Sequence, residues 1–135
     1  IETPPTVLPV ELKDEMPAII LSGLASYQLE GAEAAIQSWV KGGPLEGDEN
    51  VLGGIATFKK VEKFYGKYID YQLAKIKDLT SSSKLVYLQM NYEKGPLFAR
   101  FLCYWAGSHW VVAGRLLFDT DPQKIFLDGI VGFTG

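Results

Sequence analysis

The chain has 135 residues, of which 47% are hydrophobic and 21% are charged, and its formal net charge is -3. This length and composition indicate one globular domain with a single core and exclude a disordered chain. The charge is weakly negative and the lysines are spread along the chain, so no basic stripe is present to follow a phosphate backbone. We therefore expect no nucleic-acid partner.

The start of the chain bears on membranes and location. Its longest apolar stretch, PAIILSGLA, is far shorter than the roughly 20 residues that span a bilayer, so we expect no transmembrane segment. The first residue is Ile1 rather than methionine, which fits a processed mature protein or a chain trimmed at its start. From this we expect a protein exported to the periplasm or the outside, with a cytoplasmic location as the alternative.

The first 30 residues consist of two stretches with different sequence patterns. Residues 1–13 hold three prolines within nine positions, which predicts an extended arm rather than a helix. From Asp14 onward apolar residues recur every three or four positions, which predicts a helix over about 15–29 with Asp14 as its cap. We expect a single domain to occupy residues 14–135.

Glycine residues mark the ends of the predicted helices. Gly31 ends the first helix, and a second apolar stripe follows until the turn at 42–44. Asp48 then caps a third predicted helix, which ends at Gly66. Phe64 widens the apolar stripe of this helix, so the helix should lie on a sheet.

After Gly66 the apolar residues alternate with a period of two, which predicts strands at about 68–79, 84–92, 97–105 and 110–118. The turns between them, SSS, EKGP and AGSH, are short, so neighbouring strands should be antiparallel. Asp121 and Pro122 then predict a short terminal helix. The predicted fold class is α+β, with three N-terminal helices packed on a curved four-stranded antiparallel meander.

The corner between the first two predicted helices reads SYQLEGAEAAIQSWV. A long helix, a small-residue turn and an xAxxxF/W pattern meet there, matched by Glu30, Gly31, Ala34, Ala35 and Trp39. This arrangement resembles the nuclear transport factor two-like superfamily, the cone-shaped relatives of the cystatin-like fold, over about residues 14–118. The run NYEKGPLFARFLCYWAGSHWVV, followed by FDTDPQKI, is similar to small bacterial members of unknown function. The resemblance implies a helix-lined cone that can hold a small molecule, often in a dimer made through the outer sheet face, and no single activity.

The predicted sheet has two unlike faces. If AGSH closes the last hairpin with Trp105 opposite Trp110, one face is almost wholly apolar and the helices should cover it. On the other face Arg100 opposes Arg115, and two such charges need water, an acid such as Asp70 or a partner chain to screen them. A slip of one residue would exchange the two faces. We expect a homodimer through the outer face, with interface candidates Phe98, Arg100, Leu102, Tyr104 and Arg115.

Cys103 and His109 are the only cysteine and the only histidine of the chain, and they lie six residues apart. In the register above, Cys103 points into the apolar face while His109 lies at the turn, so they cannot act as a nucleophile and its base. We interpret Cys103 as a buried apolar residue and His109 as an exposed turn residue. A single histidine also argues against a metal site, and the glycines after residue 41 match no phosphate-binding motif. We predict no catalytic residue, no metal and no cofactor.

Aromatic residues at helical and strand spacings could line the cone or fill it as core. The pocket candidates are Tyr27, Trp39, Phe58, Phe101, Trp105 and Trp110. We expect a non-catalytic binding or accessory domain that holds a small apolar ligand in the cone or a protein partner on the outer sheet face. The alternative is an isomerase-like or dehydratase-like enzyme, in which an inward acid such as Asp70 or Asp78 works with Tyr27 or Tyr65.

Overall fold

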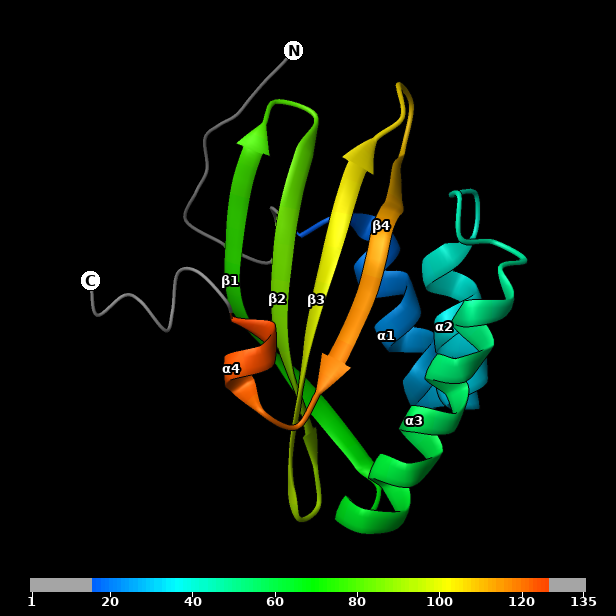
Figure 1. Ribbon diagram of the computed structural model, residues 1–135, viewed down its shortest axis with the longest axis vertical. Helices are drawn as coiled ribbons and strands as arrows, with labels where there is room; N and C mark the ends of the chain where they lie inside the picture. The colour runs from blue at the N-terminus through cyan, green and yellow to red at the C-terminus, as the bar shows by residue number, and fades with distance from the viewer. Residues whose placement is uncertain (1–15, 127–135) are drawn as a thin grey trace.

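The computed structural model describes residues 16–126, apart from the side chains at positions 50, 52, 114 and 115. The fold class is α+β, as predicted. Helices α1 (Ala18–Glu30), α2 (Ala32–Val40) and α3 (Glu49–Tyr65) come first. An antiparallel sheet follows, with β1 (Tyr68–Thr80), β2 (Ser83–Tyr92), β3 (Gly95–Trp105) and β4 (Trp110–Asp119) side by side in that order, and α4 (Pro122–Ile125) comes last. Figure 1 shows the first helices together on one side of a curved sheet and α4 on the other.

The boundaries of the elements follow the local sequence signals. The side chain of Asp121 accepts a hydrogen bond from the Gln123 amide at 2.9 Å, which confirms the predicted cap of α4. Helix α1 begins at Ala18 with Pro17 in the N-cap position, three residues later than predicted. Asp14, the predicted cap, and the predicted arm over 1–13 lie outside the described residues. Within residues 16–126, no helix has the length and hydropathy needed to cross a bilayer.

Gly31 makes the corner between α1 and α2. Its amide donates to the Tyr27 carbonyl at 3.0 Å, and its own carbonyl accepts from the Ala35 amide at 3.1 Å, so one residue ends the first helix and starts the second. Its φ of 103° lies in the region that glycine adopts without steric cost. The corner folds the two helices against each other, and this brings Trp39 of α2 onto α1.

Trp39 lies at the centre of the core and has no exposed surface. Its indole N–H donates to the Ile20 carbonyl at 3.1 Å. Its ring packs against Phe101 of β3 with the ring centroids 4.9 Å apart, and Phe118 of β4 lies 5.8 Å away. Burial of a large apolar side chain contributes about 1.5–3 kcal/mol, so this cluster is a main source of stability.

The inner face of the sheet is the apolar face that the alternation predicts. Its residues on β2 and β3 are buried together in one core: Val86, Leu88, Met90, Tyr92, Leu97, Ala99, Phe101 and Cys103. From α3, Phe58 and Val61 join this core. Phe64 does not, because it is 74% exposed, so the prediction that it widens the buried stripe of α3 is wrong.

Strand β4 departs from the predicted register. Trp105 pairs with Trp110 and Cys103 with Val112, as expected, but Phe101 pairs with Leu116 rather than with Gly114. Cys103 and Phe101 are two residues apart on β3, but their partners Val112 and Leu116 are four residues apart on β4. Strand β4 therefore contains a bulge around Gly114, because glycine weakens regular pairing. Arg100 consequently pairs with Leu117, and the predicted opposition of Arg100 and Arg115 is wrong.

The glycines of two helices allow a matched test of packing. A Cβ at Gly23 would lie 2.0 Å from the Trp39 Nε1 atom, whereas a Cβ at Gly53 would meet nothing within 4 Å. We expect Gly23→Ala to lower the free energy of unfolding by about 1–3 kcal/mol through overpacking. Gly53→Ala should raise it by about 0.5–1 kcal/mol, because alanine favours a helix. Urea unfolding followed by circular dichroism measures both, and equal effects of the same sign would contradict the close contact of α1 with Trp39.

Candidate functional site

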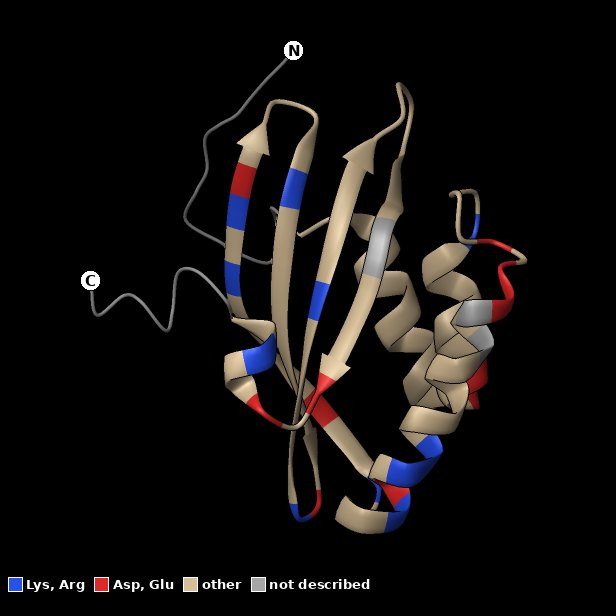
Figure 2. Cartoon of the chain, viewed as in Figure 1, with Lys and Arg blue, Asp and Glu red and all other residues tan. Residues whose placement is uncertain are grey.

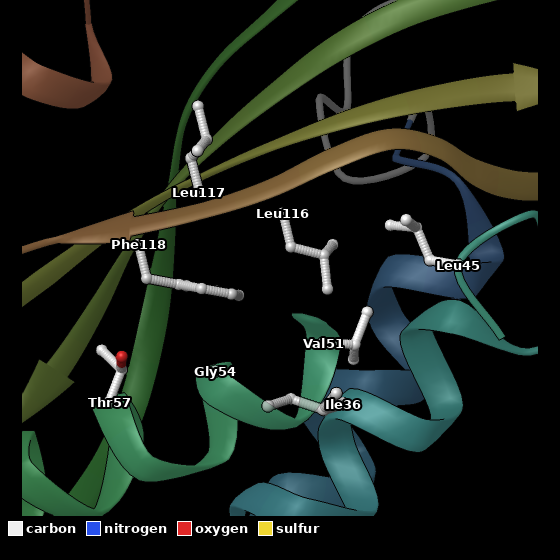
Figure 3. Close-up of a pocket in the computed structure, with 8 residues that line it drawn as sticks. All are labelled: Ile36, Leu45, Val51, Gly54, Thr57, Leu116, Leu117 and Phe118. Atoms are coloured by element: carbon white, nitrogen blue, oxygen red, sulfur yellow. The ribbon is translucent and has the colours of Figure 1, made fainter. Parts of the chain in front are cut away.

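A pocket of about 360 Å³, called here the apolar pocket, opens between α2, α3 and β4. It is lined by Ile36, Leu45, Val51, Gly54, Thr57, Leu116, Leu117 and Phe118. Figure 3 shows Leu116 and Phe118 pointing from the strand toward the helices, with Ile36 and Val51 opposite. The hydroxyl of Thr57 donates to the Gly53 carbonyl of its own helix at 3.3 Å, and none of the described lining residues is charged. The pocket therefore suits an uncharged apolar group.

Gly54 of α3 forms part of the wall of this pocket. A Cβ at this position would come 3.3 Å from the Ile36 Cδ1 atom, so the missing side chain lets α2 approach α3 closely here. The adjacent Gly53 faces open space. The two glycines inside a predicted helix indicate close packing of helices, and the sequence gives no direct signal for the pocket itself.

The predicted pocket residues do not share one cavity. Trp39, Phe58 and Phe101 have no accessible surface, so no space wide enough for water touches them, and they fill the core instead. Trp105 is 39% exposed and packs edge-on against Trp110 at the end of the sheet, with centroids 5.5 Å apart. Trp110 lines a separate pocket with His109.

Tyr27, the remaining pocket candidate, lines a pocket of about 500 Å³, called here the polar pocket. Its wall consists of Tyr27, Gln28, Gly31, Glu62, Gly66, Lys67, Tyr68 and Glu93. The Tyr27 hydroxyl donates to the Glu62 Oε2 atom and lies 2.8 Å from the Tyr92 hydroxyl oxygen. A hydroxyl has one hydrogen, so Tyr92 must donate to Tyr27 while Tyr27 donates to the carboxylate. The two tyrosines thus orient the side chain of Glu62.

Burial keeps these tyrosines protonated. It is the largest cause that raises the pKa of Tyr27, followed by its hydrogen bonds to Glu62 and Tyr92. Burial likewise raises the pKa of Tyr92 and of Tyr68. All three hydroxyls therefore remain neutral hydrogen-bond donors around neutral pH. Sequence reasoning missed the role of Glu62. This residue follows Ile55 and Phe58 at helical spacing, and a glutamate on such an apolar stripe is itself a signal of a buried polar contact.

The two acids proposed for catalysis have partners other than the hydroxyls of Tyr27 and Tyr92. Pairing irregularities interrupt β1, so its residues do not keep a strict period of two. Asp70 pairs with Asn91 and accepts a hydrogen bond from its Nδ2 atom at 2.7 Å, on the outer side of the sheet. Asp78 is exposed and forms an ion pair with Lys84, with its Oδ1 atom 3.7 Å from Nζ. Neither is an inward acid in the structure.

Cys103 and His109 are separated, as the register indicates. Cys103 is fully buried, and burial raises the pKa of its thiol to about 12. His109 is exposed, and its Nδ1 atom lies 2.9 Å from the Ser108 hydroxyl. Within residues 16–126, no group of three or more histidine, cysteine, aspartate or glutamate side chains could hold a metal ion.

Helix α4 covers part of the predicted dimer face. Phe126, directly after α4, stacks on Tyr87 with centroids 5.2 Å apart and meets Phe98 edge-on at 5.7 Å. Arg100 donates from Nη1 to the Ile125 carbonyl at 3.2 Å. These contacts bring two of the interface candidates, Phe98 and Arg100, against their own chain. Of the others, Leu102 is half-buried and Tyr104 is 46% exposed, while the side chain of Arg115 lies outside the described set.

The fold is an α+β domain in which α1, α2 and α3 cover one face of an antiparallel sheet and α4 lies on the other. Comparison of the chain with models of protein families, with curated proteins and with solved structures finds no match. The resemblance to the nuclear transport factor two-like superfamily therefore stays a prediction from the sequence.

The burial of Cys103 predicts an unreactive thiol. Only the thiolate attacks disulfide reagents, and both its raised pKa and its lack of exposure oppose that reaction. We expect almost no reaction of the folded protein with Ellman's reagent at about pH 8. In concentrated guanidinium chloride, one thiol per chain should react quickly. Rapid reaction of the folded protein would contradict the position of Cys103 in the core.

The tyrosine–glutamate contacts predict a cost for losing one hydroxyl. Tyr27→Phe leaves both Tyr92 and Glu62 without their shared partner, so the free energy of unfolding should fall by about 1–3 kcal/mol. Tyr71→Phe is the control, because Tyr71 is half-buried and no hydrogen bond of its hydroxyl is present among the described residues. Urea unfolding measures both variants, and an equal small effect would show that the hydroxyl of Tyr27 adds nothing.

Proposed function

We propose that this domain is a non-catalytic binding module that takes a small, uncharged, apolar molecule in the apolar pocket. The observation that carries the proposal is the pocket itself, which has about 360 Å³ of space and no charged side chain among its described lining residues. Ligand pockets of proteins typically measure about 300–1,000 Å³ and are mostly apolar. The sequence led us to expect either a small apolar ligand or a protein partner, and we propose the first of these. The proposed site lies between α3 and β4 rather than at the centre of the core.

The position of the pocket supports the same conclusion. Its walls come from a helix layer and from the edge strand β4, so a ligand can enter from the side without disturbing the aromatic core. We further propose the cone-shaped, nuclear transport factor two-like relationship, on the strength of the glycine corner and the helix-then-meander order. Export from a bacterial cytoplasm and a homodimer stay predictions of the sequence.

The enzymatic alternative is less well supported. A ketosteroid-isomerase-like reaction needs a base and a hydroxyl donor on opposite sides of a substrate. Here the hydroxyl of Tyr27 donates to Glu62, the acid nearest to it, so the two groups contact each other rather than a shared substrate. A substrate carbonyl would have to displace the carboxylate from the tyrosine. We therefore propose binding without catalysis.

Two neighbouring glycines provide a sharp test of the proposal. The neutral apolar dye N-phenyl-1-naphthylamine should gain fluorescence on binding to the protein. Gly54→Leu places a side chain on the pocket wall and should weaken dye binding at least about tenfold, which is 1.4 kcal/mol. Gly53→Leu, in the same helix and facing open space, should leave the affinity within about twofold.

Circular dichroism melts of both variants exclude unfolding as the cause of any loss. Equal affinity of the Gly54→Leu variant and the unchanged protein would overturn the proposed site. Failure of the dye to bind the unchanged protein would do the same.

A further inference from the structure

The polar pocket contains a carboxylate that the described part of the chain leaves without a cation. Glu62 is half-buried, and its side-chain contact is the hydrogen bond from Tyr27 to Oε2. Among the lysines and arginines whose side chains the structure describes, none forms an ion pair with it, and Tyr27 is its hydrogen-bond partner among those residues. A half-buried carboxylate is stabilised by a positive partner, because the surrounding protein screens its charge less than water does.

The two tyrosines behind this carboxylate hold it in place. Tyr92 is buried and donates to the hydroxyl of Tyr27, and Tyr27 in turn donates to Oε2. This chain of hydrogen bonds joins β2, α1 and α3, so the position of Glu62 is set by three elements of the fold. A group held in this way can bind a ligand without first being ordered, which lowers the entropic cost of binding.

The end of α3 adds to the negative potential of the pocket. Glu62 and Gly66 line it from the C-terminal end of α3, whereas at Gly31 the end of α1 and the start of α2 meet with opposite dipoles. The C-terminal end of a helix carries a partial negative charge that favours cations. The other lining carboxylate, Glu93, accepts from the backbone amide of Lys67 at 3.1 Å and so already has a structural role at the turn.

Aromatic surface decides which kind of cation fits. The ring of Tyr68 lines the pocket beside Tyr27, with the centroids 4.5 Å apart, and aromatic faces attract ammonium groups. A metal ion prefers several oxygen ligands, and the described residues hold no cluster of that kind. Figure 2 shows charged residues of both signs gathered at the C-terminal end of α3.

We propose that the polar pocket binds a small organic ammonium compound, whose cationic nitrogen contacts the carboxylate of Glu62 and the ring of Tyr68. With about 500 Å³ of space, the pocket can hold one aromatic or aliphatic amine of modest size. Lys67 on the rim opposes such a ligand by its like charge and limits the affinity. This site is separate from the apolar pocket, and the two share no lining residue among those that the structure describes.

The test titrates the full, isotope-labelled chain with benzylammonium chloride and follows amide chemical shifts. Benzyl alcohol and benzoate have the same ring without the positive charge and serve as matched probes. Benzylammonium should shift the amides of residues 27–31 and 62–68, and the other two probes should not. Equal shifts with all three probes, or no shifts with benzylammonium, would overturn the proposal.

Two substitutions with opposite expected effects on affinity distinguish a change in binding from a loss of the folded structure. Glu62→Gln keeps an oxygen that accepts from Tyr27 but removes the charge, and it should weaken benzylammonium binding at least about tenfold. Lys67→Met removes an exposed rim charge and should tighten it about two- to threefold. Glu33→Gln, an exposed change of the same charge on α2, should have no effect. Unchanged affinity in Glu62→Gln, or weaker binding in Lys67→Met, would contradict the proposed contacts.

Discussion

The packing of Trp39 against α1 is the interaction on which the rest of the structure depends. Its indole occupies the space that the absent side chain of Gly23 leaves, and its N–H satisfies the Ile20 carbonyl. The ring then reaches Phe101 on the sheet, so one side chain joins both helices of the corner to the strands. Because the close approach needs a glycine on one helix and a large aromatic group on the other, the angle of the corner follows from two residue types. The positions of both pockets depend on that angle, since α3 packs beside the pair.

Much of this fold could be predicted from the chain alone, and the exceptions have physical causes. The alternation of apolar residues gave the inner face of β2 and β3, because burial on one side of a sheet repeats every second residue. The same rule failed on β1 and at Gly114 of β4, where irregular pairing adds residues that alternation does not count. The exposed position of Phe64 was missed because a helical stripe of apolar residues does not show where the neighbouring sheet ends.

The candidate sites were harder to predict than the strands. The spacing of apolar residues identifies Trp39, Phe58 and Phe101 as inward-facing. The same spacing is found for residues that line an open cavity and for residues that pack into a solid core, so it does not tell the two apart. Only the distances between rings separate the two cases. The polar pocket depends on contacts between positions as far apart as Tyr27, Glu62 and Tyr92, which belong to three elements. No local pattern joins them, whereas the register and the helix packing bring them together.

The bulge of β4 has a consequence for how this fold could vary. It adds two residue steps to an edge strand, and a change of two preserves which side chains face the helices. Leu116 and Phe118 are thereby moved along the strand relative to α3 while remaining turned toward it. Insertions or deletions in steps of two at this place would exchange one pair of helix-facing residues for another. Phe118 lines the apolar pocket and also packs on Phe58, with the ring centroids 4.6 Å apart. A change in the shape of the pocket at this strand is thus coupled to the aromatic core through one side chain.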